Sequence, residues 1–140
     1  MSEEKTNIIV VSGGFDPLHI GHVRLIGQAA AYGLVVVALN SDEWLRRKKG
    51  YTFMPYEERK ELLEALGAVY RVEKVDDSDG SVCEALRRIR PAMFGNGGDR
   101  TSKNTPEQDL CKELGIELIW NLGRGGKVQS SSELVKKVGL

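Results

Sequence analysis

The sequence predicts an α/β fold: a single domain with a five-stranded parallel sheet and helices on both faces. Short apolar segments alternate along the chain with amphipathic segments of about ten residues, which is the order of a sheet built from βαβ units. The first two apolar segments are apolar throughout, as in parallel strands covered on both faces. The 140 residues are 41% hydrophobic and 29% charged, a composition that suits one globular core.

The individual elements follow from local patterns. Five segments have the apolar character of strands: residues 7–12, 34–39, 69–75, 92–95 and 116–121. Five others carry an apolar stripe or the end signals of helices: residues 21–32, 56–67, 81–89, 105–115 and 131–138. The clearest end signals are Thr105 before Pro106 at a helix start, and Gly115 at the other end of that helix. In such a fold, ligands bind where the carboxyl ends of the strands meet.

Composition excludes several kinds of partner. The 20 basic residues balance the 20 acidic ones, so no overall charge attracts nucleic acid or an anionic membrane. The longest apolar stretch, residues 33–39, is too short to span a bilayer, and the first residues lack the apolar region of a signal peptide. Cys83 and Cys111 lack the spacing of a metal or redox motif. We therefore expect a cytoplasmic protein with reduced cysteines and no nucleic-acid or membrane partner.

The segment GGFDPLHIGH, residues 13–22, directly follows the first predicted strand. Its glycines allow a sharp turn and the close approach of a ligand. The helix predicted to begin at Gly21 presents unpaired N–H groups, which attract anions. His19 and His22, the only histidines in the chain, are three residues apart and would share one face of that helix. Two imidazoles at a helix start can donate hydrogen bonds to phosphate oxygens, so the segment predicts a phosphate site.

Two other interpretations suit this segment less well. A His-x-x-His pair also occurs in metal sites, but no third ligand lies nearby in the sequence. A dinucleotide-binding turn requires the pattern G-x-G-x-x-G, which is absent. The sequence therefore predicts no metal held by these side chains.

The same segment resembles the G-x-F-D-x-x-H-x-G-H signature of the cytidylyltransferase-like nucleotidyltransferases, whose fold is Rossmann-like. The resemblance implies that His19 and His22 contact the triphosphate of a nucleotide and stabilise the transition state. It also implies that Gly14 and Phe15 bind the nucleotide, and that Asp16 lies on the side of the acceptor substrate.

A second segment, residues 40–59, resembles the N-S-D…K-G…E-R pattern of the sugar-phosphate nucleotidyltransferases. The resemblance implies that Lys48 or Lys49 meets a phosphate group, with Lys48 also contributing to catalysis, and that Arg59 belongs to the acceptor site. Four consecutive basic residues, 46–49, are also typical of a solvated helix or loop surface.

A third segment, residues 90–99, resembles the P-D-x-x-V-K-G-G-D pattern of the heptose-1-phosphate adenylyltransferases. The resemblance implies that Asp99 orients the nucleotide ribose or the acceptor. The lysine expected before the glycine pair is Asn96 here, which removes a positive charge from the acceptor side. A simple polar turn explains the same stretch.

A fourth segment, residues 123–134, resembles R-T-x-G-I-S-T-T of the glycerol-phosphate cytidylyltransferases and I-S-S-S of the pantetheine-phosphate adenylyltransferases. The resemblance implies that Arg124 binds the β- and γ-phosphates. Because the spacing is one residue longer than the pattern, Lys127 is a candidate to replace Arg124. Three serines would bind the nucleotide phosphates at the start of the last helix: Ser130, Ser131 and Ser132.

Together these segments predict that residues 1–140 form one free-standing nucleotidyltransferase domain. It would transfer AMP or CMP from ATP or CTP to a sugar or polyol phosphate and release pyrophosphate. The side chains would hold two anions together and stabilise the added charge, with no residue acting as nucleophile. The resemblance further implies Mg²⁺ with the triphosphate, and a homodimer.

Several alternatives remain open from the sequence. The base of the nucleotide is adenine if the chain shares the specificity of the heptose-1-phosphate adenylyltransferases, and cytosine if it shares that of the glycerol-phosphate cytidylyltransferases. The acceptor could also be another phosphorylated molecule, such as a pantetheine phosphate. A nucleotide sensor without catalysis, and a fragment of a larger synthetase-like enzyme, are the alternatives of a different class.

Overall fold

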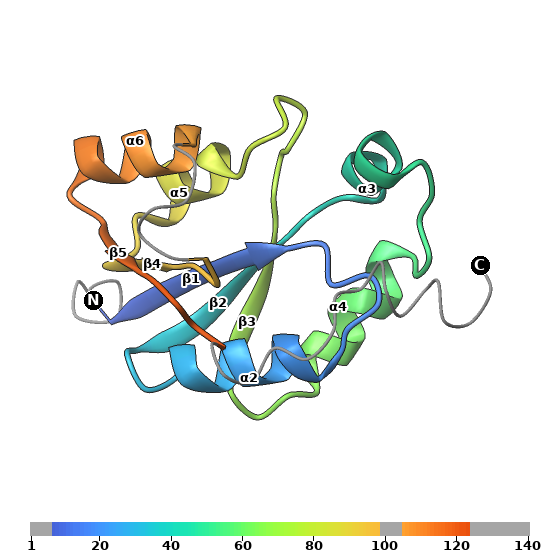
Figure 1. Cartoon of the computed structure of the whole chain (residues 1–140), viewed down its shortest axis with the longest axis horizontal. Helices are drawn as coiled ribbons and strands as arrows, with labels where there is room; N and C mark the ends of the chain where they lie inside the picture. The colour runs from blue at the N-terminus through green and yellow to red at the C-terminus, as the bar shows by residue number, and fades with distance from the viewer. Residues whose placement is uncertain (1–6, 99–104, 124–140) are drawn as a thin grey trace.

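The computed structural model describes residues 7–98 and 105–123, which contain five parallel strands in one sheet (Figure 1). The strands are β1 (Ile8–Gly13), β2 (Leu34–Leu39), β3 (Val69–Lys74), β4 (Met93–Gly95) and β5 (Glu117–Ile119). The helices are α2 (Ile20–Ala29), α3 (Asp42–Lys49), α4 (Tyr56–Glu64), α5 (Cys83–Ile89) and α6 (Pro106–Leu114). The order across the sheet is β3-β2-β1-β4-β5, so the predicted five-stranded parallel sheet is confirmed.

The sheet separates two apolar clusters, as the continuous apolar strands predict. In β1, Ile8 and Val10 belong to the cluster under α5 and α6, while Ile9 and Val11 belong to the cluster under α2 and α4. All four side chains are at most 3% exposed. Figure 1 shows α5 and α6 on one side of the sheet, and α2 and α4 on the other. Helices therefore cover both faces, and the ends of the strands are the part of the sheet left open to a ligand.

The end signals of α6 are confirmed in detail. The hydroxyl of Thr105 accepts a hydrogen bond from the N–H of Gln108, and Pro106 occupies the first helical position. Gly115 ends the helix with φ at 72°, a conformation that glycine adopts without steric cost. Helix α4 ends at Glu64, three residues before its predicted end at Gly67, and Ala65 caps it.

Helix α3 is the element that the sequence patterns missed. Its only buried residue is Leu45, so the apolar period that reveals a core-facing helix is absent. It is held instead at its two ends. The hydroxyl of Ser41 accepts the N–H of Trp44 at 3.0 Å, and Gly50 ends the helix with φ at 89°. Acidic residues in the first turn and four basic residues in the last also favour a helix, because they complement its dipole.

Strands β4 and β5 are shorter than predicted, with three residues each. Beyond the strands, the two segments stay connected by hydrogen bonds outside the regular sheet pattern. The N–H of Asn96 donates to the Ile119 carbonyl, and the N–H of Leu122 donates to the Asn96 carbonyl. At Asn121 the backbone turns with φ at 64°, which ends the extended conformation.

The predicted last helix, residues 131–138, lies outside the described residues. Within the described ranges, no helix combines the length and apolar character needed to cross a membrane.

Candidate active site

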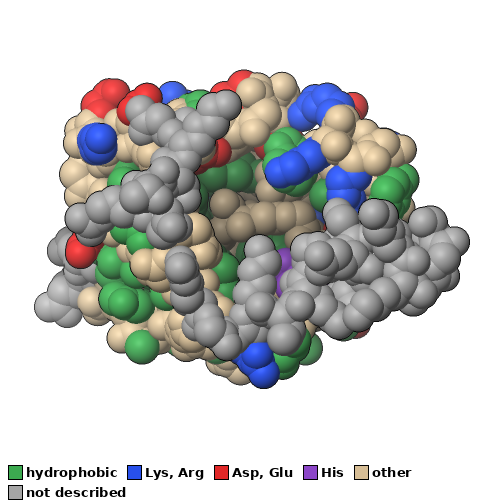
Figure 2. Space-filling model, in the orientation of Figure 1, with side chains coloured by type: hydrophobic (Ala, Val, Ile, Leu, Met, Phe, Trp, Pro, Cys, Tyr) green, Lys and Arg blue, Asp and Glu red, His purple; other side chains and the backbone are tan. Residues whose placement is uncertain are grey.

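The segment of residues 13–22 lies at the carboxyl end of β1, the central strand of the sheet. The chain passes from β1 outward to β2 and β3, and later returns to β4 on the other side of β1, so the strand order reverses there. This reversal is where open parallel sheets bind ligands. Figure 2, in the orientation of Figure 1, shows a histidine side chain near the centre of the view, with Lys and Arg side chains above it.

A crevice of about 170 Å³ opens between this segment and α3. Its lining residues are Gly14, Phe15, Asp16, His22, Trp44, Leu45, Lys48 and Lys49. The first and second predicted motifs therefore face one another across a single cavity.

The two histidines build the start of α2 with their own rings. Nδ1 of His19 accepts the N–H of Gly21 at 3.0 Å, and Nδ1 of His22 accepts the N–H of His19 at 3.1 Å. This is a capping box made of two imidazoles, where Ser or Thr and Glu are usual. The helix consequently begins at Ile20, one residue before the predicted Gly21. The rings stack with centroids 3.8 Å apart, so the predicted shared face is confirmed.

The position of the proton on each ring is inferred from these contacts. A ring nitrogen that accepts a hydrogen bond carries no proton, so in the neutral form the proton of both rings lies on Nε2. Both rings then present an Nε2–H donor, which suits a phosphate oxygen. A metal would need a lone pair on that nitrogen. The geometry therefore favours the phosphate interpretation of the His-x-x-His pair over the metal interpretation.

Phe15 and Gly14 serve the packing of this loop. The ring of Phe15 is 5% exposed and meets the ring of His22 edge-on, with centroids 4.7 Å apart, so it supports His22 from the core. A Cβ added to Gly14 would lie 2.6 Å from Cδ2 of Leu45. A larger residue would force the Leu45 side chain to move, so glycine suits the place where α3 packs on the loop.

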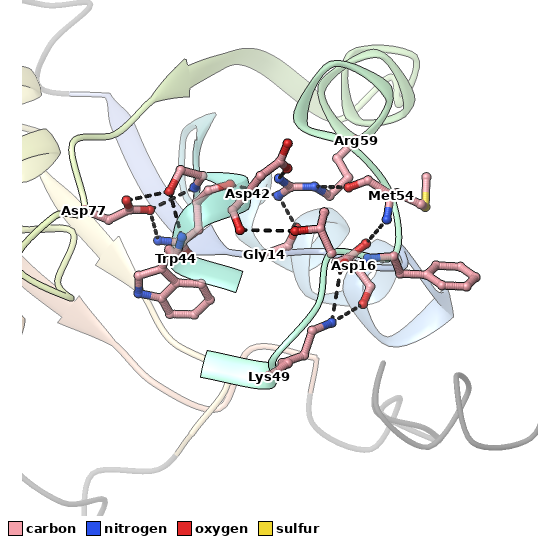
Figure 3. A network of polar contacts seen from close by, with 12 residues as sticks. Gly14, Asp16, Asp42, Trp44, Lys49, Met54, Arg59 and Asp77 are labelled. Atoms are coloured by element: carbon pink, nitrogen blue, oxygen red, sulfur yellow. Dashed lines mark hydrogen bonds and ion pairs between the residues drawn. The ribbon is translucent and has the colours of Figure 1, made fainter. Parts of the chain in front are cut away.

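Asp16 has a different role from the predicted contact with the acceptor. Its side chain is fully buried, and its carboxylate accepts the backbone N–H of Phe53 at 2.8 Å and that of Met54 (Figure 3). Nζ of Lys49 lies 3.3 Å from the same carboxylate. Asp16 therefore ties the connection between α3 and α4 to the first loop.

Arg59 also departs from its predicted role in the acceptor site. Its side chain is 0% exposed. The guanidinium donates to the backbone carbonyls of Gly14 and Asn40, both at 2.8 Å, and forms an ion pair with Asp42. It also donates to the carbonyl of Met54 (Figure 3). A planar, five-donor group suits such a junction of loops, and burial leaves no surface for an acceptor.

Asp77, which sequence reasoning missed, completes this framework from the loop after β3. It is 4% exposed, and its carboxylate accepts the backbone N–H of Ser41 at 2.8 Å and the Ser41 hydroxyl at 2.7 Å. The side-chain amide of Asn40 donates to the same carboxylate at 3.0 Å. The surrounding segment DDSDG, residues 76–80, predicts only a turn, because nothing in the sequence indicates which of its carboxylates is buried.

The two candidate phosphate-binding lysines differ in the structure. Lys49 forms an ion pair with Asp16, and its side chain is 16% exposed. Lys48 is exposed, and its Nζ lies 4.7 Å from the centroid of the Trp44 indole. Within the described ranges Lys48 forms no ion pair, so it is the better placed of the two to meet an anion.

Asn96 lies apart from the crevice. Its side-chain amide donates to the carbonyl of Phe94 at 3.2 Å and to that of Ile119 at 3.4 Å, which ties the ends of β4 and β5 together. The structure does not bring it beside Lys48. The other predicted ligands lie outside the described residues: Asp99, Arg124, Lys127, Ser130, Ser131 and Ser132.

Known proteins resemble this chain in sequence and in fold. A D-beta-D-heptose 1-phosphate adenylyltransferase of Bordetella bronchiseptica is 36% identical over 112 residues, which cover 77% of this chain and 68% of that protein. A bifunctional protein HldE of Wolinella succinogenes is 37% identical over 94% of this chain and 27% of its own length. The chain spans about a quarter of the length of such bifunctional relatives.

Among solved structures, a lipopolysaccharide core biosynthesis protein of Thermoplasma volcanium shares the fold. Its TM-score is 0.68 at 22% identity, over 81% of this chain and 93% of that one. The model of the cytidylyltransferase-like family matches residues 10–132. With the two stacked imidazoles at the end of β1 and this match over most of its length, the chain belongs to the cytidylyltransferase-like family.

Proposed function

We propose that this chain is a nucleotidyltransferase that moves an adenylyl group from ATP to the phosphate of a sugar phosphate. The observation that carries the proposal is the pair of Nε2–H donors that His19 and His22 hold at the start of α2. The choice of adenylyl transfer and of a sugar phosphate rests on the name of the relative that is 36% identical, a heptose 1-phosphate adenylyltransferase.

In the proposed reaction, the triphosphate lies against the start of α2 and receives hydrogen bonds from His19 and His22. An oxygen of the acceptor phosphate attacks the α-phosphorus in line and forms a new P–O bond. The bond from the α-phosphorus to the oxygen bridging to the β-phosphate breaks, and pyrophosphate leaves. The attacking oxygen carries no proton, so the residues provide position and charge stabilisation. Lys48 would reduce the repulsion between the two anions.

The strand order suggests where each substrate lies. The nucleotide would occupy the reversal between β1 and β4, and the acceptor the crevice under α3. We keep Asp99, Arg124 and the serines 130–132 as proposed nucleotide contacts, on the resemblance alone.

The Mg²⁺ that the resemblance implies finds no carboxylate ligand in this crevice. Mg²⁺ prefers oxygen ligands, and Asp16 is the one acidic residue that lines the cavity. Its carboxylate is buried and engaged by two N–H groups and Lys49. His19 and His22 present N–H donors instead. We therefore assign the metal no ligand among the described residues of the crevice, and no step above depends on it.

Transfer of a cytidylyl group from CTP is the second candidate, because the first and last motifs also resemble the glycerol-phosphate enzymes. A nucleotide sensor without catalysis is the alternative of another class. We also propose a cytoplasmic location, a homodimer and the absence of a nucleic-acid partner, on the resemblance and on the balanced charge of the chain.

The test is pyrophosphate release from ATP and from CTP, each with a heptose 1-phosphate, a hexose 1-phosphate, glycerol 3-phosphate and 4′-phosphopantetheine. We expect release with ATP and a sugar phosphate, and its loss in the His19→Ala variant. Release with CTP and glycerol 3-phosphate would establish the second candidate instead. Nucleotide binding without release from any pair would favour the sensor.

A further inference from the structure

Trp44 is the one aromatic residue of α3, and its indole connects the loops that follow three neighbouring strands. Its Nε1–H donates to the carbonyl of Gly80, in the loop after β3, at 3.2 Å. Its six-membered ring reaches the loop after β1, where Cζ3 lies 3.7 Å from the place of a Cβ on Gly14. The backbone N–H of Trp44 is itself bonded to Ser41, after β2. The indole is therefore fixed in the wall of the crevice that also contains His22.

Lys48 lies one helical turn beyond Trp44 on the same side of α3, and both residues line the crevice. The ammonium sits 4.7 Å from the indole centroid, at the end of a flexible four-carbon chain. An anion can therefore draw the ammonium toward itself while the indole keeps its place. The crevice thus offers a rigid aromatic surface and one movable positive charge beside His22.

We propose that Trp44 and Lys48 form the acceptor subsite, and that Trp44 selects a phosphate carried on a ring over one carried on an open polyol chain. The inference rests on the proposed function and names the acceptor side of that same site. Lys48 would pair with the acceptor phosphate, and the indole would cover the C–H face of the sugar ring.

The selectivity follows from the shape of the two acceptors. A pyranose presents several C–H bonds in one plane, and these lie well against the negative face of an aromatic ring. A glycerol phosphate has no such plane, and it would lose chain entropy on being held flat against the indole. Both acceptors offer the same phosphate to Lys48, so the difference between them measures the contribution of Trp44.

Tryptophan fluorescence tests this directly, because the chain has only two tryptophans, Trp44 and Trp120. In the Trp120→Phe variant, Trp44 is the sole indole. We would titrate it with a heptose 1-phosphate, a hexose 1-phosphate, glycerol 3-phosphate and inorganic phosphate, in the presence of a non-hydrolysable ATP analogue. We expect at least one cyclic sugar phosphate to change the emission, with an affinity about tenfold above that of glycerol 3-phosphate. Equal responses to both kinds of acceptor, or none to the cyclic ones, would overturn the inference.

Substitution of the indole separates binding from packing. With the best cyclic acceptor, Trp44→Leu should raise the dissociation constant measured by calorimetry about tenfold and leave that of the ATP analogue within about twofold. Trp44→Phe should recover most of the loss. Trp120→Leu is the matched control and should change neither constant. If Trp44→Leu weakens both ligands equally, Trp44 is only structural and the inference fails.

The two proposals can fail separately. If no acceptor releases pyrophosphate but a cyclic phosphate still changes the emission of Trp44, the subsite stands and the proposed reaction fails. If pyrophosphate is released but substitution of Trp44 leaves the dissociation constant of the acceptor unchanged, the proposed reaction stands and the proposed subsite is wrong.

Discussion

His19 and His22 stack with their ring centroids 3.8 Å apart, and each uses Nδ1 to accept a backbone N–H of the same helix start. The contacts that begin α2 are therefore the contacts that orient both Nε2–H donors. Local folding and the proposed chemistry share the same two side chains, so a substitution must be chosen to separate them.

We predict that His19→Asn separates them. Asparagine is a favoured N-cap residue, so its side-chain oxygen can replace Nδ1 as the acceptor for Gly21, and the free energy of unfolding should change by less than about 0.5 kcal/mol. The Nε2–H donor is lost, and pyrophosphate release should fall by a factor of about 100 or more. His19→Ala, which loses both, should also be about 1 kcal/mol less stable in urea unfolding. An Asn variant as active as the native protein would contradict the role of the imidazole.

We predict that Asp16→Asn destabilises the protein although the change is nearly isosteric. The amide can accept only through one oxygen and cannot pair with Lys49, so one of the N–H groups of Phe53 and Met54 loses its partner. The expected loss is about 2–3 kcal/mol in the free energy of unfolding, measured with urea. Glu61→Gln, the same change at an exposed position of α4, should stay within about 0.5 kcal/mol. Equal stability of the two variants would show that the Asp16 contacts contribute nothing.

We predict that Arg59→Lys is not conservative. One ammonium cannot reach the carbonyls of Gly14 and Asn40 and the carboxylate of Asp42 together, so buried acceptors lose their donors. We expect a loss of about 2 kcal/mol or more in the free energy of unfolding. Arg46→Lys, at an exposed position of α3, is the matched control and should change stability little. If lysine replaces Arg59 without loss, the guanidinium is not what holds these loops.

We predict that neither cysteine reacts with a thiol reagent in the folded protein at pH 8. Burial raises the pKa of the Cys111 thiol to about 11, and its side chain is 0% exposed, so the reactive thiolate is scarce and shielded. Cys83 lies in the same apolar cluster and is 4% exposed. A chromogenic disulfide should label both residues in urea, and label the native protein only as it opens. Labelling within seconds at pH 8 would show that the cluster is accessible.

The same shift gives a pH dependence with a definite sign. Because folding raises the pKa of Cys111 above its usual 9.0, the folded state keeps the thiol proton longer than the unfolded chain does. This contribution to stability is complete below pH 9 and is lost as the pH rises toward 11. Unfolding in urea across this range, compared between the native protein and Cys111→Ala, would measure it.

The elements with a regular pattern were predictable from the sequence. The apolar runs of β1 and β2 and the end signals of α6 are local, and the structure repeats them almost residue by residue. The pair of His19 and His22 was predictable for the same reason, since three residues in a helix fix their separation. Helix α3 was missed because it has one buried residue and is held by its ends.

The roles of Asp16, Arg59 and Asp77 could not be read from the sequence. Apart from Met54, which is five residues from Arg59, their partners lie between 17 and 45 residues away. Most of these partners are backbone groups, whose identity leaves no mark in the sequence. A charged residue in a motif suggests contact with a ligand. A buried charged residue that holds loops together looks identical in the sequence. Only the exposure of each side chain distinguishes the two, and exposure depends on the whole fold.

The way α3 is attached has a consequence for altering this protein. The side chains that fasten the helix lie along its whole length: Ser41, Asp42, Trp44, Leu45, Arg47 and Lys49. The side chains of Glu43, Arg46 and Lys48 take no part in that attachment and are exposed. These three exposed positions can therefore be randomised in a library while the attached side chains keep the helix in place. If the proposed function holds, selection from such a library would change the acceptor preference without rebuilding the proposed nucleotide side.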